Sequence, residues 1–437
     1  MKFSSDEKKW QVRCFYDWPS EPSQEGSEKL DPLCQTAESD GKAKTGDPKT
    51  ASECCCLIAT SEAFWHVTFC YAAAGIIRST IALPRPTRDA GKNGHKQQLA
   101  DVPLGEWPCG HVSGVAMILL PVVIAVALSW LAIRILLAHP GRLPQDHPNA
   151  RSLHAAPVPR AGGWAVWAGW LGATLWLPGP RQWLGPFLAL VAVSLLDDRR
   201  GVHPLLRLAA QVAAALAWLW LAGWPIHPLI AVALIVWMAN LYNFMDGSDG
   251  LAAAMSLIGF GSYAAGAAVA GASDALALAA LAAATVPFLL YNLPPARIFL
   301  GDAGSVPLGF LAAVFGIAGW VEHWWPAWFP ILVFLPFVAD ASATLAVRLA
   351  RGARVWEAHR EHCYQRLVQM GWGHARTLAL YGGLMLATAG SALAALVWAP
   401  AAGLPALAVW TVVLGSLFAL TGYHWRRREA EFGESKG

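Results

Sequence analysis

The 437-residue chain is 56% hydrophobic and only 14% charged, and its mean hydropathy is +0.41. Soluble domains of this length need far more polar surface, so the composition excludes them and predicts a protein that crosses the membrane many times. The net charge of +3 gives no indication of nucleic-acid binding.

The first 116 residues differ in composition from the rest of the chain. They hold nine of the ten lysines and seven of the eight cysteines, with only Cys363 further along. The cysteines, three of them in a row at 54–56, fit neither a zinc site nor a disulfide framework, and no secretory signal begins the chain. We expect residues 1–116 to be an atypical segment, disordered or produced by a mis-assigned start ahead of Met117. A real extension that touches the membrane at 54–83 is the alternative.

From Met117 onward the chain consists of eleven apolar segments followed by a basic tail at 425–437. Ala, Gly and Leu dominate these segments and Trp lies near many of their ends, which is typical of packed, interfacially anchored membrane helices. We predict an all-α polytopic membrane bundle of about 10–11 transmembrane helices over residues 117–424. The segments are roughly 117–138, 162–178, 184–196, 204–222, 225–245, 250–271, 275–293, 305–320, 327–347, 376–398 and 403–424.

The arginines predict which loops share one side of the membrane. If the first span runs from the outside of the membrane to the cytoplasm, only Arg181 of the eighteen arginines after Met117 falls on the outer side. This is the positive-inside pattern, so every charged motif described below is expected in one cytoplasmic active-site cleft. The loops on that side are 139–161, 197–203, 246–250, 294–304, 348–375 and the tail after 424.

Two adjacent carboxylates, Asp197 and Asp198, follow directly after an apolar segment. They could form a base or metal-binding pair, in which one carboxylate deprotonates a nucleophile while the other faces a cation or an arginine. A solvated helix end beside Arg199 and Arg200 explains them about as well. Taken alone, this pair is a weak signal.

Four polar residues, Asn240, Asn243, Asp246 and Asp249, recur at every third position where two apolar segments meet. On a helix each such step rotates by about 300°, so the four side chains drift through about 180° and cannot share one narrow face. Glycines at 247 and 250 let the helix end or loosen after Asp246, so that the polar groups converge. Oxygen ligands of this kind suit Mg²⁺. A helix cap with an incidental acidic turn is the plain alternative.

A third motif places Asp302 directly after Gly301 and before an apolar segment. A carboxylate on such a tight turn lies where a phosphate can approach the backbone closely. An ordinary turn, or close helix packing at the glycines that follow, is the alternative.

Basic residues mark two further loops. His359, Arg360 and His362 suit the binding of phosphate oxygens; zinc would need a third ligand that is not clearly placed, and a solvated basic face is the bland alternative. Arg160 lies with Arg151 and His154 in a Pro/Gly-rich loop, which an ordinary basic cytoplasmic loop explains nearly as well.

In combination these motifs resemble the polyprenyl-phosphate N-acetylhexosamine-1-phosphate transferases, the superfamily that includes the phospho-MurNAc-pentapeptide translocase. The resemblance covers about residues 117–424 and leaves out the amino-terminal segment. It depends on the order, spacing and common membrane side of Asp197-Asp198, Pro204-Leu-Leu-Arg207, the stretch from Asn240 to Ala252, Phe299-Leu-Gly-Asp-Ala-Gly-Ser305 and His359-Arg-Glu-His362.

The resemblance implies transfer of a sugar 1-phosphate from a UDP-N-acetylhexosamine to undecaprenyl phosphate, with release of UMP. It implies Mg²⁺, for which Mn²⁺ can substitute, and a bacterial inner membrane location with the active site facing the cytoplasm. The lipid bilayer is the other expected partner, no nucleic acid is expected, and a homodimer is left open.

The resemblance also implies roles for the candidate residues. Asp302 matches the metal-ligating aspartate, with Asp246 as a second metal candidate, and Asp197 and Asp198 match the pair usually given the base role. The substrate-binding candidates are Asn240, Asn243, Asp246, Asp249, Arg160, His359, Arg360 and His362.

One departure from the family pattern affects the expected branch. The loop has His359-Arg-Glu-His362 instead of consecutive histidines, which favours the branch that initiates O-antigen or related glycans over the phospho-MurNAc-pentapeptide transferases. We expect direct attack by the lipid phosphate, and a two-step route through an aspartyl intermediate is the alternative. An ion-coupled secondary transporter would need sites near mid-depth and internal symmetry, and the sequence shows no repeat.

Overall fold

The computed structural model describes residues 110–146, 157–177, 179, 181–354 and 359–434. Most of the atypical segment 1–116 and the candidates Arg151 and His154 therefore lie outside the described residues. The helices are α3 (Gly110–Ala138), α4 (Gly162–Thr174), α5 (Leu184–Arg200), α6 (Pro204–Leu221), α7 (Pro228–Phe244), α8 (Leu251–Val269), α9 (Ala275–Asn292), α10 (Asp302–Val321), α11 (Trp328–Val333), α12 (Leu335–Ala350), α13 (Cys363–Leu367), α14 (Gly373–Trp398) and α15 (Gly403–Glu434). The short turns are η1 (Pro140–Arg142), η2 (Val368–Trp372) and η3 (Pro400–Ala402).

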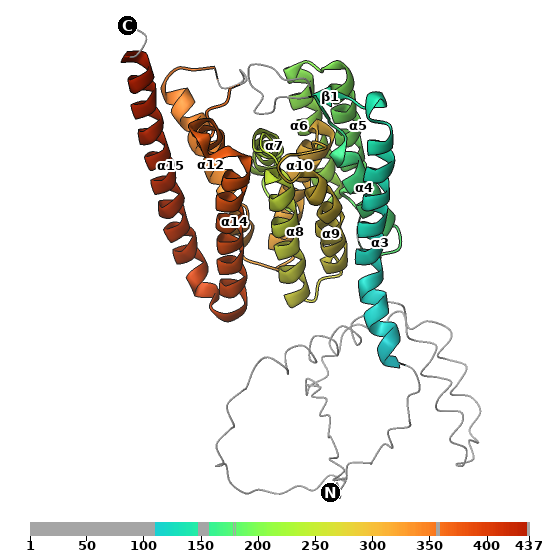
Figure 1. The fold of residues 1–437 in the computed structure, drawn as a ribbon. Helices are drawn as coiled ribbons and strands as arrows, with labels where there is room; N and C mark the ends of the chain where they lie inside the picture. Colours follow the sequence, from blue (N-terminus) through green and yellow to red (C-terminus); the bar gives the residue numbers. More distant parts are fainter. Residues whose placement is uncertain (1–109, 147–156, 178, 180, 355–358, 435–437) are drawn as a thin grey trace, which may run out of the picture. The chain divides into compact units, whose positions relative to one another are not determined.

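The prediction of an all-α membrane bundle is confirmed. In the described part of the chain, each of the eleven apolar segments lies in helical structure, and seven helices are long and apolar enough to cross a membrane by length and composition. Figure 1 shows them in ribbon form, with α14 and α15 side by side. Helix α15 continues into the basic tail as far as Glu434.

The ninth segment, expected as one helix over 327–347, is two helices. α11 ends at Val333 and α12 begins at Leu335, with Phe334 between them. Pro336 is the second residue of α12. A proline has no N–H to donate, so it would interrupt a continuous helix but is tolerated in the first turn of a new one. The proline therefore starts a new helix at a point where hydropathy alone indicates no boundary.

Helix α10 lies in the centre of the bundle and packs against α4, α5, α7 and α8. Gly309 allows its close approach to α7, since a Cβ at this position would lie 2.7 Å from the Cα of Ala239. This contact brings the start of α10 and the end of α7, which carry two of the candidate motifs, to the same end of the bundle.

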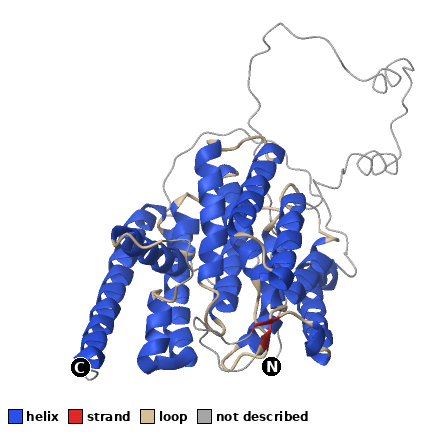
Figure 2. Ribbon diagram, turned by 90° about the horizontal axis from the view of Figure 1, so that it is seen from above, coloured by secondary structure: helices blue, strands red, loops and turns tan. Residues whose placement is uncertain are grey.

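A short antiparallel pair of strands adjoins that end. β1 (Gln145–Asp146) pairs with β2 (Val158–Pro159), as Figure 2 shows among the helices. The chain after β2 then runs beside the segment before α10, with Arg160 bridged to Phe299 and the Gly162 amide donating to the Phe299 carbonyl at 2.8 Å. These backbone bonds fix Arg160 beside the start of α10.

The stretch from Asn240 to Gly250 differs in detail from the expectation. α7 ends at Phe244, two residues before Asp246 and not after it. Gly250 has a φ of +77°, which favours glycine, and it precedes the first residue of α8. Gly247 serves another purpose, because a Cβ there would collide with the Tyr364 hydroxyl. The glycines thus permit one turn and one close contact.

Candidate active site

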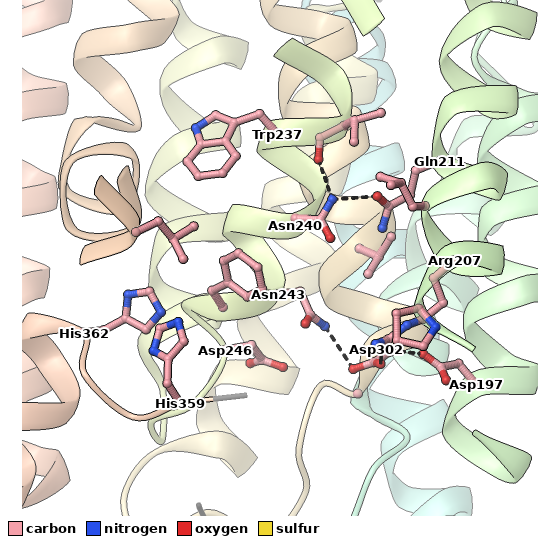
Figure 3. A pocket seen from close by; sticks show the side chains of 18 of the residues that line it. Asp197, Arg207, Gln211, Trp237, Asn240, Asn243, Asp246, Asp302, His359 and His362 are labelled. Carbon is pink, nitrogen blue, oxygen red and sulfur yellow. Dashed lines mark hydrogen bonds and ion pairs between the residues drawn. The ribbon is translucent and has the colours of Figure 1, made fainter. Parts of the chain in front are cut away.

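A cavity of about 1240 Å³ opens where these helix ends meet. Its polar part is lined by candidate residues from five separate motifs, most of which Figure 3 shows from close by. Its apolar part continues between α6 and α7 along Leu205, Leu208, Leu216 and Leu229, all of which are also exposed on the outside of the helices. One cavity therefore joins a charged centre to an apolar groove on the membrane-facing side.

Asp302 is the hub of the charged centre. Its Oδ1 accepts hydrogen bonds from Arg160 Nη2 and Asn243 Nδ2, both at 2.9 Å, and Arg207 Nη1 lies 3.5 Å from its Oδ2. Its side chain remains 17% exposed to the cavity. The carboxylate is thus held from three directions and still faces the cavity.

Asp198 holds the start of the helix that carries Asp302. Its two carboxylate oxygens accept from the backbone amides of Asp302 at 3.0 Å and Ala303 at 2.9 Å, and Arg160 lies 3.3 Å away. A negative charge at a helix N-terminus is favourable. Gly301, with a φ of +77°, leaves room for this carboxylate, because a Cβ there would lie 2.9 Å from Asp198 Oδ2. Asp198 is therefore placed to position Asp302.

Asp197 points to the other side of the same helix end. Its Oδ2 accepts from Arg207 Nη1 at 2.9 Å, and its Oδ1 accepts from the Val202 amide at 2.6 Å. Unlike Asp198, Asp197 lines the cavity. The two adjacent carboxylates therefore differ in what they can contact, and Asp197 is the one that can meet a substrate.

Asn240 lies one turn deeper in α7 than Asn243. Its Nδ2 donates to Gln211 Oε1 at 2.6 Å and to the Val236 carbonyl at 2.8 Å, so Asn240 Oδ1 and Gln211 Nε2 are left to face the cavity. Figure 3 shows this amide pair between the charged centre and Trp237. It forms the polar boundary of the apolar groove.

Asp246 lies between Asp302 and the histidines (Figure 3). No hydrogen bond to its carboxylate is present among the described residues, although it lines the cavity. Within the same residues, no cluster of three or more His, Cys, Asp and Glu side chains could hold a metal ion. Mg²⁺ commonly takes one or two carboxylates and completes its coordination with water and phosphate oxygens. Asp302 and Asp246 fit that pattern.

The charge count also fits a divalent cation. The four carboxylates of Asp197, Asp198, Asp246 and Asp302 exceed the two guanidinium groups of Arg160 and Arg207 by two negative charges if all six groups are ionised, and Asp146 adds a further carboxylate to the cavity. A bound divalent cation would reduce this excess.

The pKa shifts reflect the same crowding. Burial, and then the charge of Asp302, raises the pKa of Asp198 to about 6. Burial is also the main cause that raises the pKa of Asp246 well above its ordinary value and the pKa of Asp197 above its own. These carboxylates would all be easier to ionise beside a cation.

Asp249 also lines the cavity, but its carboxylate contacts other residues than those around Asp302. Its Oδ2 accepts from the Ala296 amide at 3.0 Å, and His374 Nδ1 lies 3.6 Å from its Oδ1. The Asp249 side chain is only 11% exposed. It fixes the turn that carries Asp246, and the structure does not bring it into the group around Asp302.

His359 and His362 form the opposite side of the cavity, with ring centroids 4.9 Å apart. The Nδ1 atom of each ring is buried and has no hydrogen-bond partner in the described part of the chain. Burial, followed by repulsion from His362 and Arg348, lowers the pKa of His359 to about 4. Both residues line the cavity, and a neutral imidazole can donate a hydrogen bond to an anionic ligand from one ring nitrogen.

Arg360, between the two histidines, is exposed and does not line the cavity. Its neighbour Glu361 is held by Arg348 and lies 3.5 Å from Arg366 and 3.8 Å from Arg351. The arginines of this loop therefore fix its conformation, while the histidines face the cavity.

Sequence reasoning did not select three residues that line the site. Arg207 and Gln211 lie four residues apart on α6, and His374 begins α14 and contacts Ser248 Oγ at 3.0 Å. The i to i+4 spacing of Arg207 and Gln211 in an otherwise apolar helix is a signal that could have found two of them.

Part of the chain is similar to a known protein family and to several named proteins. Residues 182–320 match glycosyl transferase family 4. The chain is 28% identical over 255 residues to a probable undecaprenyl-phosphate N-acetylglucosaminyl 1-phosphate transferase of Bacillus subtilis. This alignment covers 52% of this chain and 71% of the relative. The chain is also 28% identical over 271 residues to an undecaprenyl-phosphate alpha-N-acetylglucosaminyl 1-phosphate transferase of Yersinia pestis. This second alignment covers 54% of this chain and 72% of the relative.

A shorter match is to a phospho-N-acetylmuramoyl-pentapeptide-transferase of Moorella thermoacetica, 39% identical over 126 residues, 26% of this chain and 39% of the relative. The matched family segment runs from α5, which carries Asp197 and Asp198 in its last turn, to α10, which begins with Asp302.

Proposed function

With the resemblance to the polyprenyl-phosphate N-acetylhexosamine-1-phosphate transferase superfamily confirmed by these comparisons, we propose that the protein transfers N-acetylhexosamine 1-phosphate from a UDP-sugar to undecaprenyl phosphate. UMP would be the second product, and the lipid-linked diphosphate sugar would initiate O-antigen or another cell-envelope glycan. The proposed location is the bacterial inner membrane, with the site facing the cytoplasm.

One observation carries the proposal. The cavity joins a charged centre of carboxylates, guanidinium groups and imidazoles to an apolar groove between α6 and α7. A ligand that fills both parts must have a phosphate at one end and a long apolar chain at the other, and a polyprenyl phosphate has this chemistry. The remaining polar volume would take the nucleotide sugar.

In the proposed reaction an oxygen of the lipid phosphate attacks the β-phosphorus of the UDP-sugar. The new P–O bond forms as the bond between the β-phosphorus and the UMP oxygen breaks, and UMP leaves with the electron pair. Asp197 would accept a proton from the lipid phosphate when that group arrives protonated, and Arg207, 2.9 Å from Asp197, would hold the phosphate in place. An aspartyl intermediate on Asp197 is the alternative, which trapping a labelled phospho-sugar on the protein would reveal.

Mg²⁺, held by Asp302 and Asp246, would supply neutralisation of the phosphate charge when bound. Arg160 and Asn243 orient Asp302 for this purpose, and His359 and His362 would donate to phosphate oxygens from the other side. Positioning and charge neutralisation are the main requirements of phosphoryl transfer, so these side chains form a sufficient set.

The direct test is an assay of membranes that contain the full-length protein, with undecaprenyl phosphate and a panel of UDP-sugars, with and without Mg²⁺. We expect Mg²⁺-dependent UMP release with at least one UDP-N-acetylhexosamine. Release with UDP-MurNAc-pentapeptide alone would reassign the protein to peptidoglycan synthesis. No release with any donor would contradict the proposal.

A further inference from the structure

Asp340 is a carboxylate buried in the apolar helix α12, and it does not line the active-site cavity. Its Oδ1 accepts from the Cys363 amide at 2.8 Å and from Thr344 Oγ1 at 3.2 Å. Its Oδ2 accepts from the Tyr364 amide at 3.1 Å and from Tyr381 Oη at 2.5 Å. A carboxylate in a membrane helix is costly, so this number of donors indicates a specific purpose.

The donors place Asp340 directly behind His362. The two amides belong to the residues that follow His362, so the carboxylate fixes the backbone at this point of the loop. His362 Nδ1 lies 3.8 Å from Asp340 Oδ1 and is the buried ring nitrogen that has no hydrogen-bond partner among the described residues. A shift of about 0.6 Å would bring the two atoms within hydrogen-bond range.

Aromatic rings limit how the imidazole can turn. The ring of His362 stacks with Phe244 at 6.1 Å and with Tyr364 at 5.9 Å, with interplanar angles of 26° and 16°. His362 also lines the cavity, as Figure 3 shows. With Nδ1 toward Asp340, the Nε2 edge is the part of the ring left for a ligand.

We propose that Asp340 is a positioning residue for the transfer reaction and acts through His362. It would accept the Nδ1 proton, fix the tautomer and orientation of the ring, and keep Nε2 directed at a phosphate oxygen of the substrate. Carboxylates that hold the far nitrogen of a functional histidine do this in other sites. The inference rests on the proposed function, because it requires that His362 contacts a phosphate.

The competing explanation is that Asp340 only stabilises the fold, since its carboxylate also accepts hydrogen bonds from the first two backbone amides of α13. The two explanations differ in what happens when His362 is removed. If Asp340 acts through His362, its loss has no further effect on activity in a protein that lacks the imidazole. If it only stabilises the fold, its loss has the same effect in both backgrounds.

The experiment is a double-mutant cycle with Asp340→Asn, His362→Gln and the double variant in the full-length protein. Thr344→Val is the matched control, because Thr344 donates to the same Oδ1 atom but does not line the cavity. We measure kcat/KM for UMP release and the thermal midpoint of each purified variant. We expect Asp340→Asn to lower kcat/KM about 10- to 100-fold, and the double variant to match His362→Gln. The control should keep wild-type kcat/KM.

Equal losses from Asp340→Asn in the presence and absence of His362 would overturn the proposal, as would wild-type kcat/KM in Asp340→Asn. UMP binding gives a second readout that does not need turnover, and it is measured as the increase in thermal midpoint when UMP is added. Wild-type protein that binds UMP but releases none from any donor would contradict the proposed function alone. UMP binding that is unchanged in Asp340→Asn but weakened in His362→Gln would contradict the role of Asp340 alone, and binding to neither wild type nor variant would contradict both.

Discussion

The two sides of the cavity are built alike and charged differently. The acidic wall consists of Asp197, Asp302 and the residues that hold them. Asp198 fixes it by accepting hydrogen bonds from the first two backbone amides of α10. The histidine wall, which consists of His359 and His362, is fixed by Asp340 under the first two amides of α13. Both supporting carboxylates have fully buried side chains.

The difference lies in how the facing groups are paired. On the acidic wall, Arg160 and Arg207 already contact the carboxylates, so that wall is organised before any ligand binds. On the histidine wall, each imidazole has a buried nitrogen without a hydrogen-bond partner within the described residues. Under the proposed function, the acidic wall would hold a cation in a site that is already organised, while on the histidine wall Asp340 would accept the Nδ1 proton of His362 and the substrate would meet Nε2.

The largest expected effect tests the acidic wall. Asp302→Asn removes a charge that Arg160, Arg207 and Asn243 all contact, and we expect kcat for UMP release to fall by about 10²–10³. Asp274→Asn is the control, since Asp274 is another buried carboxylate and does not line the cavity. Full activity of Asp302→Asn at unchanged expression would exclude its metal role.

A smaller effect is expected from the support of that wall. Asp198→Asn leaves an amide that can accept only one of the two backbone hydrogen bonds in good geometry, and we expect activity to fall about 10-fold. The thermal midpoint should fall as well, because loss of a helix cap costs about 0.5–2 kcal/mol of unfolding free energy. A large activity loss with an unchanged midpoint would show that Asp198 acts in the chemistry itself.

The smallest effect concerns the charge of the histidine wall. The folded protein holds the pKa of His359 at about 4, below the ordinary value of 6.5, so the unfolded chain binds a proton in this interval that the folded protein does not. The contribution of neutral His359 to the free energy of unfolding should be fully present above pH 6.5 and should be lost as the pH falls toward 4. Thermal midpoints across this range should decrease less for His359→Gln than for the wild type. Parallel curves would mean that His359 is not held neutral.

The sequence was sufficient to predict the helices, because each apolar segment lies in helical structure, although the ninth segment forms two helices. Hydropathy did not show the break at Phe334, since the flanking residues are as apolar as those of a continuous span, although Pro336 was a sequence signal for it. Arg207 was quoted within a motif but given no role, and Gln211 was not selected; the packed bundle shows that α6 meets α7 and that Arg207 reaches Asp302. Arg360 was selected by composition, but the loop turns its side chain outward.

The apolar groove between α6 and α7 has a kinetic consequence. Because Leu205 and Leu229 are 68% and 76% exposed at its border, a lipid substrate can reach the charged centre by lateral diffusion without leaving the bilayer. The acceptor concentration that governs turnover is then a surface density, measured as a mole fraction among neighbouring lipids. Added inert phospholipid or detergent would slow the reaction at constant bulk concentration of every reactant.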